Sequence, residues 1–250
     1  MNAAPEQTAL DAYRAELLLL TEAMSVTTEE APQADVDSQL QLDVFARENF
    51  DKRIDKVKAQ IEFIQEAFDD LPELLRVFSL EHPMALYDRQ NSDGAAFLDW
   101  LTDRHQLTGA QKDSVTVARS RIRIEEIAAV ERAEHVRFQE LLGAAEELLP
   151  ELETNIDLQL HLNPIRVRAR LLTDTFLEGE KPPVDVVFFA RDEDVRTAVL
   201  GATGLELLEE LARFAPCTFG VWVLLSDIAE REELIRFAQQ LVELGLLALE

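Results

Sequence analysis

The spacing of apolar residues changes near Pro150, and this change constrains the fold more than any other feature of the chain. Before Pro150, apolar side chains recur every three or four residues, which is the period of an amphipathic helix. After it, apolar and polar residues alternate in several stretches, as in strands with one buried face. The sequence therefore predicts an α+β protein, with a helical bundle domain over residues 1–150 and a second domain over residues 151–250.

The strongest helical signal is a stripe of apolar residues spaced 3, 4, 3, 4, 3 and 4 apart. Its members are Ile54, Val57, Ile61, Ile64, Phe68, Leu71 and Leu75. Pro72 is expected to kink or restart this helix, with Asp70 as the new cap. An earlier helix is predicted over residues 7–24, followed by an acidic loop over residues 25–38 and, after a turn at residues 91–94, a short helix around Trp100.

Thr108 and Gln111 have the spacing of a capping box and are predicted to open a helix that runs to Leu149. The apolar stripe of this helix is interrupted by Glu131 and His135, which lie one turn apart. Two interpretations stay open. The pair belongs either to an internal polar network with nearby arginines or to a face that docks a partner protein.

The C-terminal half contains alternating stretches over residues 156–162 and 165–171, joined at Asn163 and Pro164. This pattern predicts two paired strands, with Asp157 and the following arginines on one polar face. Further strands are predicted over residues 184–189 and 195–200, and helices over residues 204–214 and 230–244 with Gly245 as the stop. Residues 218–228 are ambiguous between helix and strand. This order is typical of a winged-helix domain with a small antiparallel sheet.

The charge balance bears on the partners that such a domain can bind. Lys and Arg number 24 against 49 Asp and Glu, a formal net charge of −25. Residues 192–250 alone contain twelve acidic and four basic residues. Because non-specific affinity for nucleic acid comes from clustered cations, this balance argues against DNA or RNA, and equally against an anionic membrane. A winged-helix transcription regulator is therefore only an alternative.

Cysteine usage and hydropathy indicate the compartment. The single cysteine, Cys217, is expected to be a buried thiol, and one thiol cannot form an internal disulfide. The longest apolar runs, residues 17–20 and 221–225, are far shorter than a membrane span. No signal-peptide pattern opens the chain. We expect a cytoplasmic protein.

Motifs for catalysis or cofactor binding do not occur in this sequence. It contains no Gly-x-Ser-x-Gly and no glycine-rich phosphate loop. A carboxylate-bridged di-iron bundle needs two Glu-x-x-His motifs, whereas Glu131 and His135 are separated by three residues. We therefore expect no catalytic, cofactor-binding or metal-ligating residues and no enzymatic activity, with a helical-bundle metalloenzyme as an alternative.

A winged helix that does not bind DNA can bind a peptide as an added strand. The candidate edge is Val195–Val199, which is Val195, Arg196, Thr197, Ala198 and Val199, and the facing helix offers Arg236, Phe237, Gln240 and Leu241. The alternative is an ordinary packing domain without a ligand.

Several segments together resemble a known group of proteins. They are AFDDLPELLRVF, FLDWL, RIRIEEIAAVERAEHVRFQELL, HLNP and VVFFARDED, within residues 45–245. In this pattern the chain resembles the partner subunits of TIM-barrel, multinuclear-iron oxidases that modify ribosomally synthesised peptides in methanobactin-type and thiaglutamate-type biosynthesis.

The resemblance implies a role without catalysis. Such a partner holds no iron itself. It binds the leader region of a precursor peptide and forms a heterodimer with the oxidase, which raises the effective concentration of the substrate. Carried over to this chain, the peptide edge is Val195–Val199 with Arg236 and Gln240, and the docking surface includes Arg123, Glu131 and His135.

Overall fold

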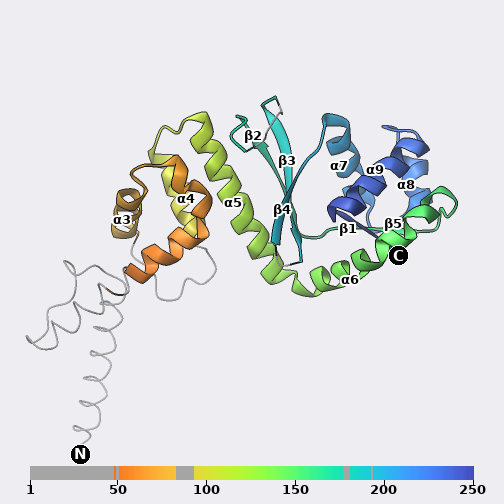
Figure 1. The fold of residues 1–250 in the computed structure, drawn as a ribbon, viewed down its shortest axis with the longest axis horizontal. Coiled ribbons are helices and arrows are strands. Elements are labelled where there is room, and N and C mark those ends of the chain that lie inside the picture. The colour runs from red at the N-terminus through yellow and green to blue at the C-terminus, as the bar shows by residue number, and fades with distance from the viewer. Residues whose placement is uncertain (1–47, 49–50, 83–92, 177–180, 193) are drawn as a thin grey trace, which may run out of the picture. The chain divides into compact units, whose positions relative to one another are not determined.

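A computed structural model of the chain describes residues 48, 51–82, 93–176, 181–192 and 194–250 (Figure 1). The helix and loop predicted over residues 7–24 and 25–38 lie outside these residues, as do residues 91 and 92 of the turn predicted at 91–94. Contacts divide the chain into two compact units, Met1–Gln111 and Lys112–Glu250. This division differs from the boundary predicted at residue 150, because residues of the stretch 112–149, such as Ile124 and Phe138, pack in the cores of the C-terminal sheets.

The first unit is helical. Its described elements are a helix over residues 51–60, the 3₁₀ helix η1 (Glu62–Ala67), α3 (Leu71–Glu81) and α4 (Asp93–Arg104). The prediction of one helix through the apolar stripe up to Pro72 is wrong, since the chain turns at Ile61 and tightens into η1. The stripe itself is buried apart from Ile54. Asp70 occupies the N-cap of α3 as predicted, although its side chain makes no capping hydrogen bond.

Two helices lead through the second unit to its sheets. They are α5 (Gly109–Val130) and α6 (Arg132–Leu148), followed by the 3₁₀ helix η2 (Leu149–Glu153). The capping box is confirmed: the Thr108 N–H donates to Gln111 Oε1 at 3.0 Å, and the Gln111 N–H donates to Thr108 Oγ1 at 3.3 Å. The single helix predicted up to Leu149 is wrong. The chain bends at Glu131, which becomes the N-cap of α6.

The strands form two three-stranded antiparallel sheets, so the α+β class is confirmed. One sheet has the order β5-β1-β6, formed by β5 (Cys217–Thr218), β1 (Gln159–Leu162) and β6 (Leu247–Leu249). The other has the order β2-β3-β4, formed by β2 (Arg166–Leu171), β3 (Val184–Arg191) and β4 (Asp194–Val199). The predicted pairing of the first two strands is wrong, because β1 and β2 belong to different sheets and Asp157 shares no face with the arginines of β2.

Asn163 explains why the chain crosses between the sheets instead of turning back. This side chain is fully buried. Its Nδ2 donates to the carbonyls of Ala190 at 2.8 Å and Gly245 at 3.1 Å, and its Oδ1 accepts from the Ile165 N–H at 2.9 Å. Because buried polar groups must be hydrogen-bonded, these contacts hold the start of β2 against the end of β3.

Side chains pack on both faces of the β2-β3-β4 sheet. On one face, Val186 and Phe188 lie in a core with Val117 and Ile124 of α5. On the other face, Val187, Phe189 and Ala198 lie in a core with the C-terminal helices. The sheet is therefore covered by helices above and below, and its two outer strands, β2 and β4, are its edges.

The C-terminal helices are α7 (Ala202–Phe214), α8 (Phe219–Leu225) and α9 (Arg231–Leu244). The first and third confirm the predicted helices, and α8 occupies part of the ambiguous stretch. Gly245 ends α9 at a φ of 86°, which is favourable only for glycine, as predicted. Within the described residues, no helix is both long and apolar enough to cross a membrane.

Candidate peptide-binding edge and adjoining pocket

β4 is an edge strand that pairs with β3 alone in the sheet order. The Ala190 N–H donates to the Ile165 carbonyl on the β2 side, so the pair formed by Ala190 and Val195 is a non-hydrogen-bonded pair. The alternation of an antiparallel ladder then places the backbone groups of Val195, Thr197 and Val199 on the outer side of β4. These groups are where an added strand would pair.

The side chains of Val195, Thr197 and Val199, the residues whose backbone groups point away from β3, do not block access to this edge. Val195 is half-buried against the core shared with α5, whereas Thr197 and Val199 are exposed. Arg196 is exposed too, and its guanidinium pairs with Asp194 at 3.2 Å. Ala198 is buried on the opposite face of the sheet. A peptide strand that pairs with the outward backbone groups of Val195, Thr197 and Val199 would therefore lie next to the small, uncharged side chains of these three residues.

One outward carbonyl of β4 is already in use. Arg121 of α5 donates from Nη1 to the Val195 carbonyl at 3.3 Å, a contact that is partly buried. In the described part of the chain, no hydrogen bond reaches the outward groups of Thr197 or Val199. The open part of the edge is thus its C-terminal half.

The α9 residues predicted to face this edge divide into two kinds. Phe237 and Leu241 are buried in the C-terminal core, and the Phe237 ring lies against Gly204 and Trp222. They pack the domain together and offer no surface to a peptide in this conformation. Arg236 and Gln240 are exposed, but among the described residues no hydrogen bond or ion pair joins them to β4. The sequence pattern did not separate the buried face of α9 from its exposed face.

The residues predicted to dock a partner lie near the bend between α5 and α6. Arg123 is 62% exposed and pairs with Glu126 at 3.2 Å. Glu131 is half-buried at the bend itself, so it does not share a continuous helical stripe with His135. His135 Nε2 lies 3.3 Å from the Asp192 carbonyl at the end of β3. The exposed valines Val130 and Val136 flank this bend.

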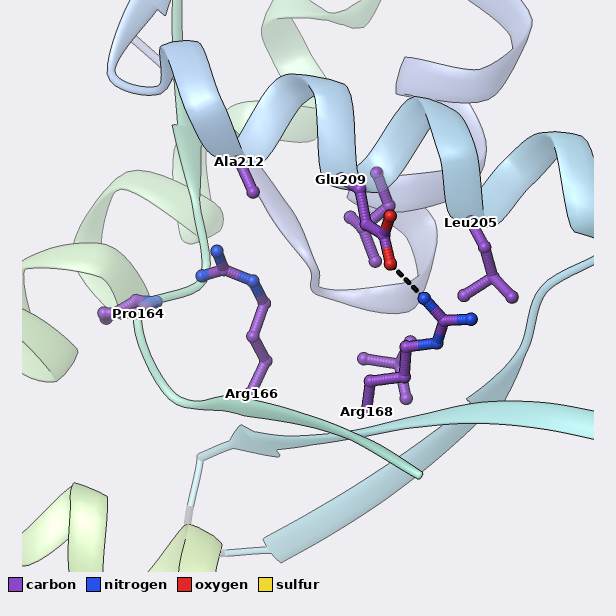
Figure 2. A pocket seen from close by; sticks show the side chains of 8 residues that line it. Pro164, Arg166, Arg168, Leu205, Glu209 and Ala212 are labelled. Carbon is purple, nitrogen blue, oxygen red and sulfur yellow. Dashed lines mark hydrogen bonds and ion pairs between the residues drawn. The ribbon is translucent and has the colours of Figure 1, made fainter. Parts of the chain in front are cut away.

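The opposite edge of the sheet carries a pocket that sequence reasoning missed. The cavity has a volume of about 340 Å³ and lies between β2 and α7 (Figure 2). It is lined by Pro164, Arg166, Arg168, Val187, Leu205, Leu208, Glu209 and Ala212. The alternating arginines of β2 were a visible signal, but the sequence assigned them to a hairpin face with Asp157 instead of a surface beneath a helix.

The two arginines of the pocket differ in their partners. Arg168 forms ion pairs with Glu209 and, at 3.2 Å, with Asp185. Arg166 donates from Nη1 to the Asn163 carbonyl at 2.5 Å, and within the described residues it has no ion pair. Burial lowers the pKa of the Arg166 guanidinium from its ordinary value, because the charged form loses contact with water.

Other groups of possible chemical use are isolated. Cys217 is buried and free, and burial raises the pKa of its thiol, which disfavours the reactive thiolate. Among the described residues, no three His, Cys, Asp or Glu side chains are grouped so that they could hold a metal ion.

No family model, no curated protein and no solved structure matches this chain.

Proposed function

We propose that this chain is a non-catalytic partner protein that binds the leader region of a ribosomally synthesised precursor peptide and docks it onto an iron-dependent TIM-barrel oxidase. The observation that carries the proposal is the open half of the β4 edge, where Thr197 and Val199 direct backbone groups away from β3. An extended peptide can satisfy those groups by pairing as an additional strand, without a preformed pocket for each side chain.

The arrangement around β4 supports a winged-helix type of peptide-recognition domain. The three-stranded antiparallel sheet β2-β3-β4 is followed along the chain by α7, the short strand β5, α8 and α9. The two residues of the open half, Thr197 and Val199, have small uncharged side chains, which suits pairing through backbone atoms. The acidic balance of residues 192–250 favours a leader that carries some basic residues.

The bend between α5 and α6 is the surface that we assign to the oxidase. Exposed apolar side chains surrounded by polar ones are typical of protein interfaces. Val130 is 80% exposed and Val136 is 51% exposed, and Glu131, His135 and Arg123 lie along the same stretch of chain. With the peptide on β4 and the oxidase at this bend, one protein would hold substrate and catalyst together.

The test begins with the genes that flank the gene for this chain. A short reading frame with cysteines and an iron-oxidase gene are expressed, and each product is titrated into the purified chain by calorimetry. We expect binding to both, and co-purification of the oxidase with the chain. Binding to neither product, or flanking genes that encode neither, would contradict the proposal.

The assignment of the two surfaces is tested separately. Val130→Glu with Val136→Glu should weaken binding to the oxidase while leaving leader binding unchanged. In α8, Leu224 is 81% exposed and Leu225 is 50% exposed, so Leu224→Glu with Leu225→Glu is a matched control that adds the same charge at apolar surface positions elsewhere. Equal loss in both variants would contradict the assignment of the bend.

A further inference from the structure

The pocket between β2 and α7 combines apolar walls with two arginines on its β2 side. Figure 2 shows Arg166 and Arg168 rising from β2 toward α7, with Glu209, Leu205 and Ala212 above them. Val187, Leu205 and Leu208 are buried side chains that form the apolar part of the lining. A space of about 340 Å³ can take a small organic molecule or a side chain.

Arg166 is the unbalanced charge of this pocket. A guanidinium has five N–H donors, and its planar fork matches a carboxylate in a bidentate pair. The Asn163 carbonyl uses one Nη1 donor and brings no full negative charge. A half-buried cation without an ion pair is unfavourable, so an anion in the pocket would gain both charge-assisted hydrogen bonds and relief of that cost.

The charges around Arg166 limit what kind of anion fits. Arg166, Arg168 and Glu209 give the lining a net charge of about +1, and Asp185, which pairs with Arg168 from outside the lining, reduces the local positive charge further. Glu209 would repel a second negative charge on the ligand. A monovalent carboxylate therefore fits better than a phosphate dianion, and the apolar walls favour a hydrocarbon body next to it.

From this geometry we propose that the β2–α7 pocket binds a carboxylate carried on an apolar body, with the carboxylate on Arg166 and the body against Leu205, Leu208 and Val187. The inference is independent of the proposed leader binding, because it concerns the opposite edge of the sheet. The same chemistry can come from a free small acid or from an acidic side chain in a peptide.

The experiment uses 4-methylpentanoate as the free acid and 4-methylpentanamide as its neutral isostere. Calorimetry and ¹H–¹⁵N spectra of the full chain should show the acid binding with a dissociation constant of about 1 mM, which is reasonable for a ligand of this size. The amide should bind at least about tenfold more weakly, because it cannot form the charged pair. Equal binding of the acid and the amide would overturn the proposal.

Variants locate the site. Arg166→Met should weaken binding of the acid by about 10- to 100-fold, whereas Arg170→Met, an exposed arginine of the same strand outside the lining, should change it less than about twofold. Ala212→Phe, which fills the mouth of the pocket from α7, provides a second route if Arg166→Met does not fold. An unchanged affinity in both Arg166→Met and Ala212→Phe would contradict the site.

A blocked peptide distinguishes the two sources of the carboxylate. Acetyl-Leu-Glu-Leu-amide presents its only carboxylate on a side chain. Tighter binding of this peptide than of 4-methylpentanoate, lost in Arg166→Met, would assign the pocket to a peptide. Binding of the free acid alone would assign it to a small molecule. Both results support a carboxylate site, and failure of both probes to bind contradicts it.

Discussion

The two edges of the β2-β3-β4 sheet belong to one sheet but have opposite chemistry. The hydrogen-bonding alternation directs the backbone groups of Arg166, Arg168 and Arg170 outward on β2, and those of Val195, Thr197 and Val199 outward on β4. On β2, every residue whose backbone groups point away from β3 is therefore an arginine. On β4, every such residue has a small uncharged side chain.

This difference separates two kinds of recognition within one sheet. Charged side chains along an edge discourage the addition of another strand, and natural sheets use them for that purpose. The arginines of β2 therefore protect that edge while providing a cation to the pocket beneath α7. The outward-pairing residues of β4 are uncharged, so an extended peptide can pair there. The side chains, and not the backbone geometry, determine which edge accepts a strand.

The edges also differ in how firmly the fold holds them. The start of β2 is held by the buried Asn163. Its end is held by the buried Asp113, whose carboxylate accepts from the Leu172 and Thr173 N–H groups at 2.7 Å each. β4 is held mainly by its ladder with β3 and by the Arg121 contact to Val195. A rigid β2 suits a shaped pocket, and a less restrained β4 suits an added strand.

The largest effect is expected from Asn163→Ala, which removes the link between β2, β3 and the end of α9. Two buried carbonyls and one N–H lose their partner, so the free energy of unfolding should fall by about 3 kcal/mol or more. Urea unfolding measures this change. Hydrogen exchange should rise around Ile165 more than along β4.

Asn155→Ala is the matched control, because this asparagine is only half-buried and makes local contacts with Glu151 and Asp157. It should cost less than about 1 kcal/mol. If the two variants were equally stable, the anchoring of β2 by Asn163 would be refuted.

Much of the element order was predictable from the sequence, because it depends on local patterns. The capping box of Thr108 and Gln111, the stop at Gly245 and the strands at β3 and β4 all follow from signals within a few residues. The separation of β1 from β2 was not predictable. It depends on Asn163 bonding to Ala190 and Gly245, which are distant in sequence.

The candidate site was predictable only in part, for the same reason. The β4 edge could be named because Val195–Val199 follows a buried strand after a short turn. The burial of Phe237 and Leu241 depends on how α9 packs against Gly204 and Trp222. The pocket depends on α7 lying over β2, and no local pattern encodes that contact. Glu131 was misplaced because the bend between α5 and α6 contains neither proline nor glycine.

The next largest effect concerns strand addition at β4. Thr197→Pro removes an N–H that points away from β3 and places a ring at the open edge. Binding of the leader peptide should weaken by about tenfold or more, as measured by calorimetry. The fold should tolerate this change, because proline is accepted where the missing N–H faces away from the ladder.

The control for this prediction is proline at the other edge. Arg168→Pro also removes an outward N–H, but on β2, and should leave leader binding within about twofold of the unchanged chain. Loss of leader binding in Arg168→Pro but not in Thr197→Pro would contradict pairing at β4, since the peptide would then pair with β2.

A smaller effect is expected on the stability of the ligand-free chain. Arg166→Met removes a desolvated cation that has no ion pair among the described residues, so it should change the free energy of unfolding by less than about 1 kcal/mol, and in the stabilising direction. Urea unfolding without added acid measures this. A loss above about 1 kcal/mol would indicate that Arg166 has a structural role, and not a ligand-binding one.

The smallest effect distinguishes the edges by their response to salt. Pairing at β4 uses neutral backbone groups, whereas the pocket uses the charge of Arg166, and dissolved ions screen interactions between partly exposed charges. Raising the salt concentration from about 0.05 to 0.5 M should weaken 4-methylpentanoate binding about two- to threefold. An uncharged variant of the leader peptide, with its acidic and basic residues replaced by glutamine, should change less than about 1.5-fold over the same range. Calorimetry on one protein preparation measures both.

Equal salt dependence of the two ligands would mean that charged recognition is not confined to β2 and neutral recognition is not confined to β4. The expected difference in salt dependence follows from the arginines on β2 and the small uncharged side chains of Val195, Thr197 and Val199 on β4.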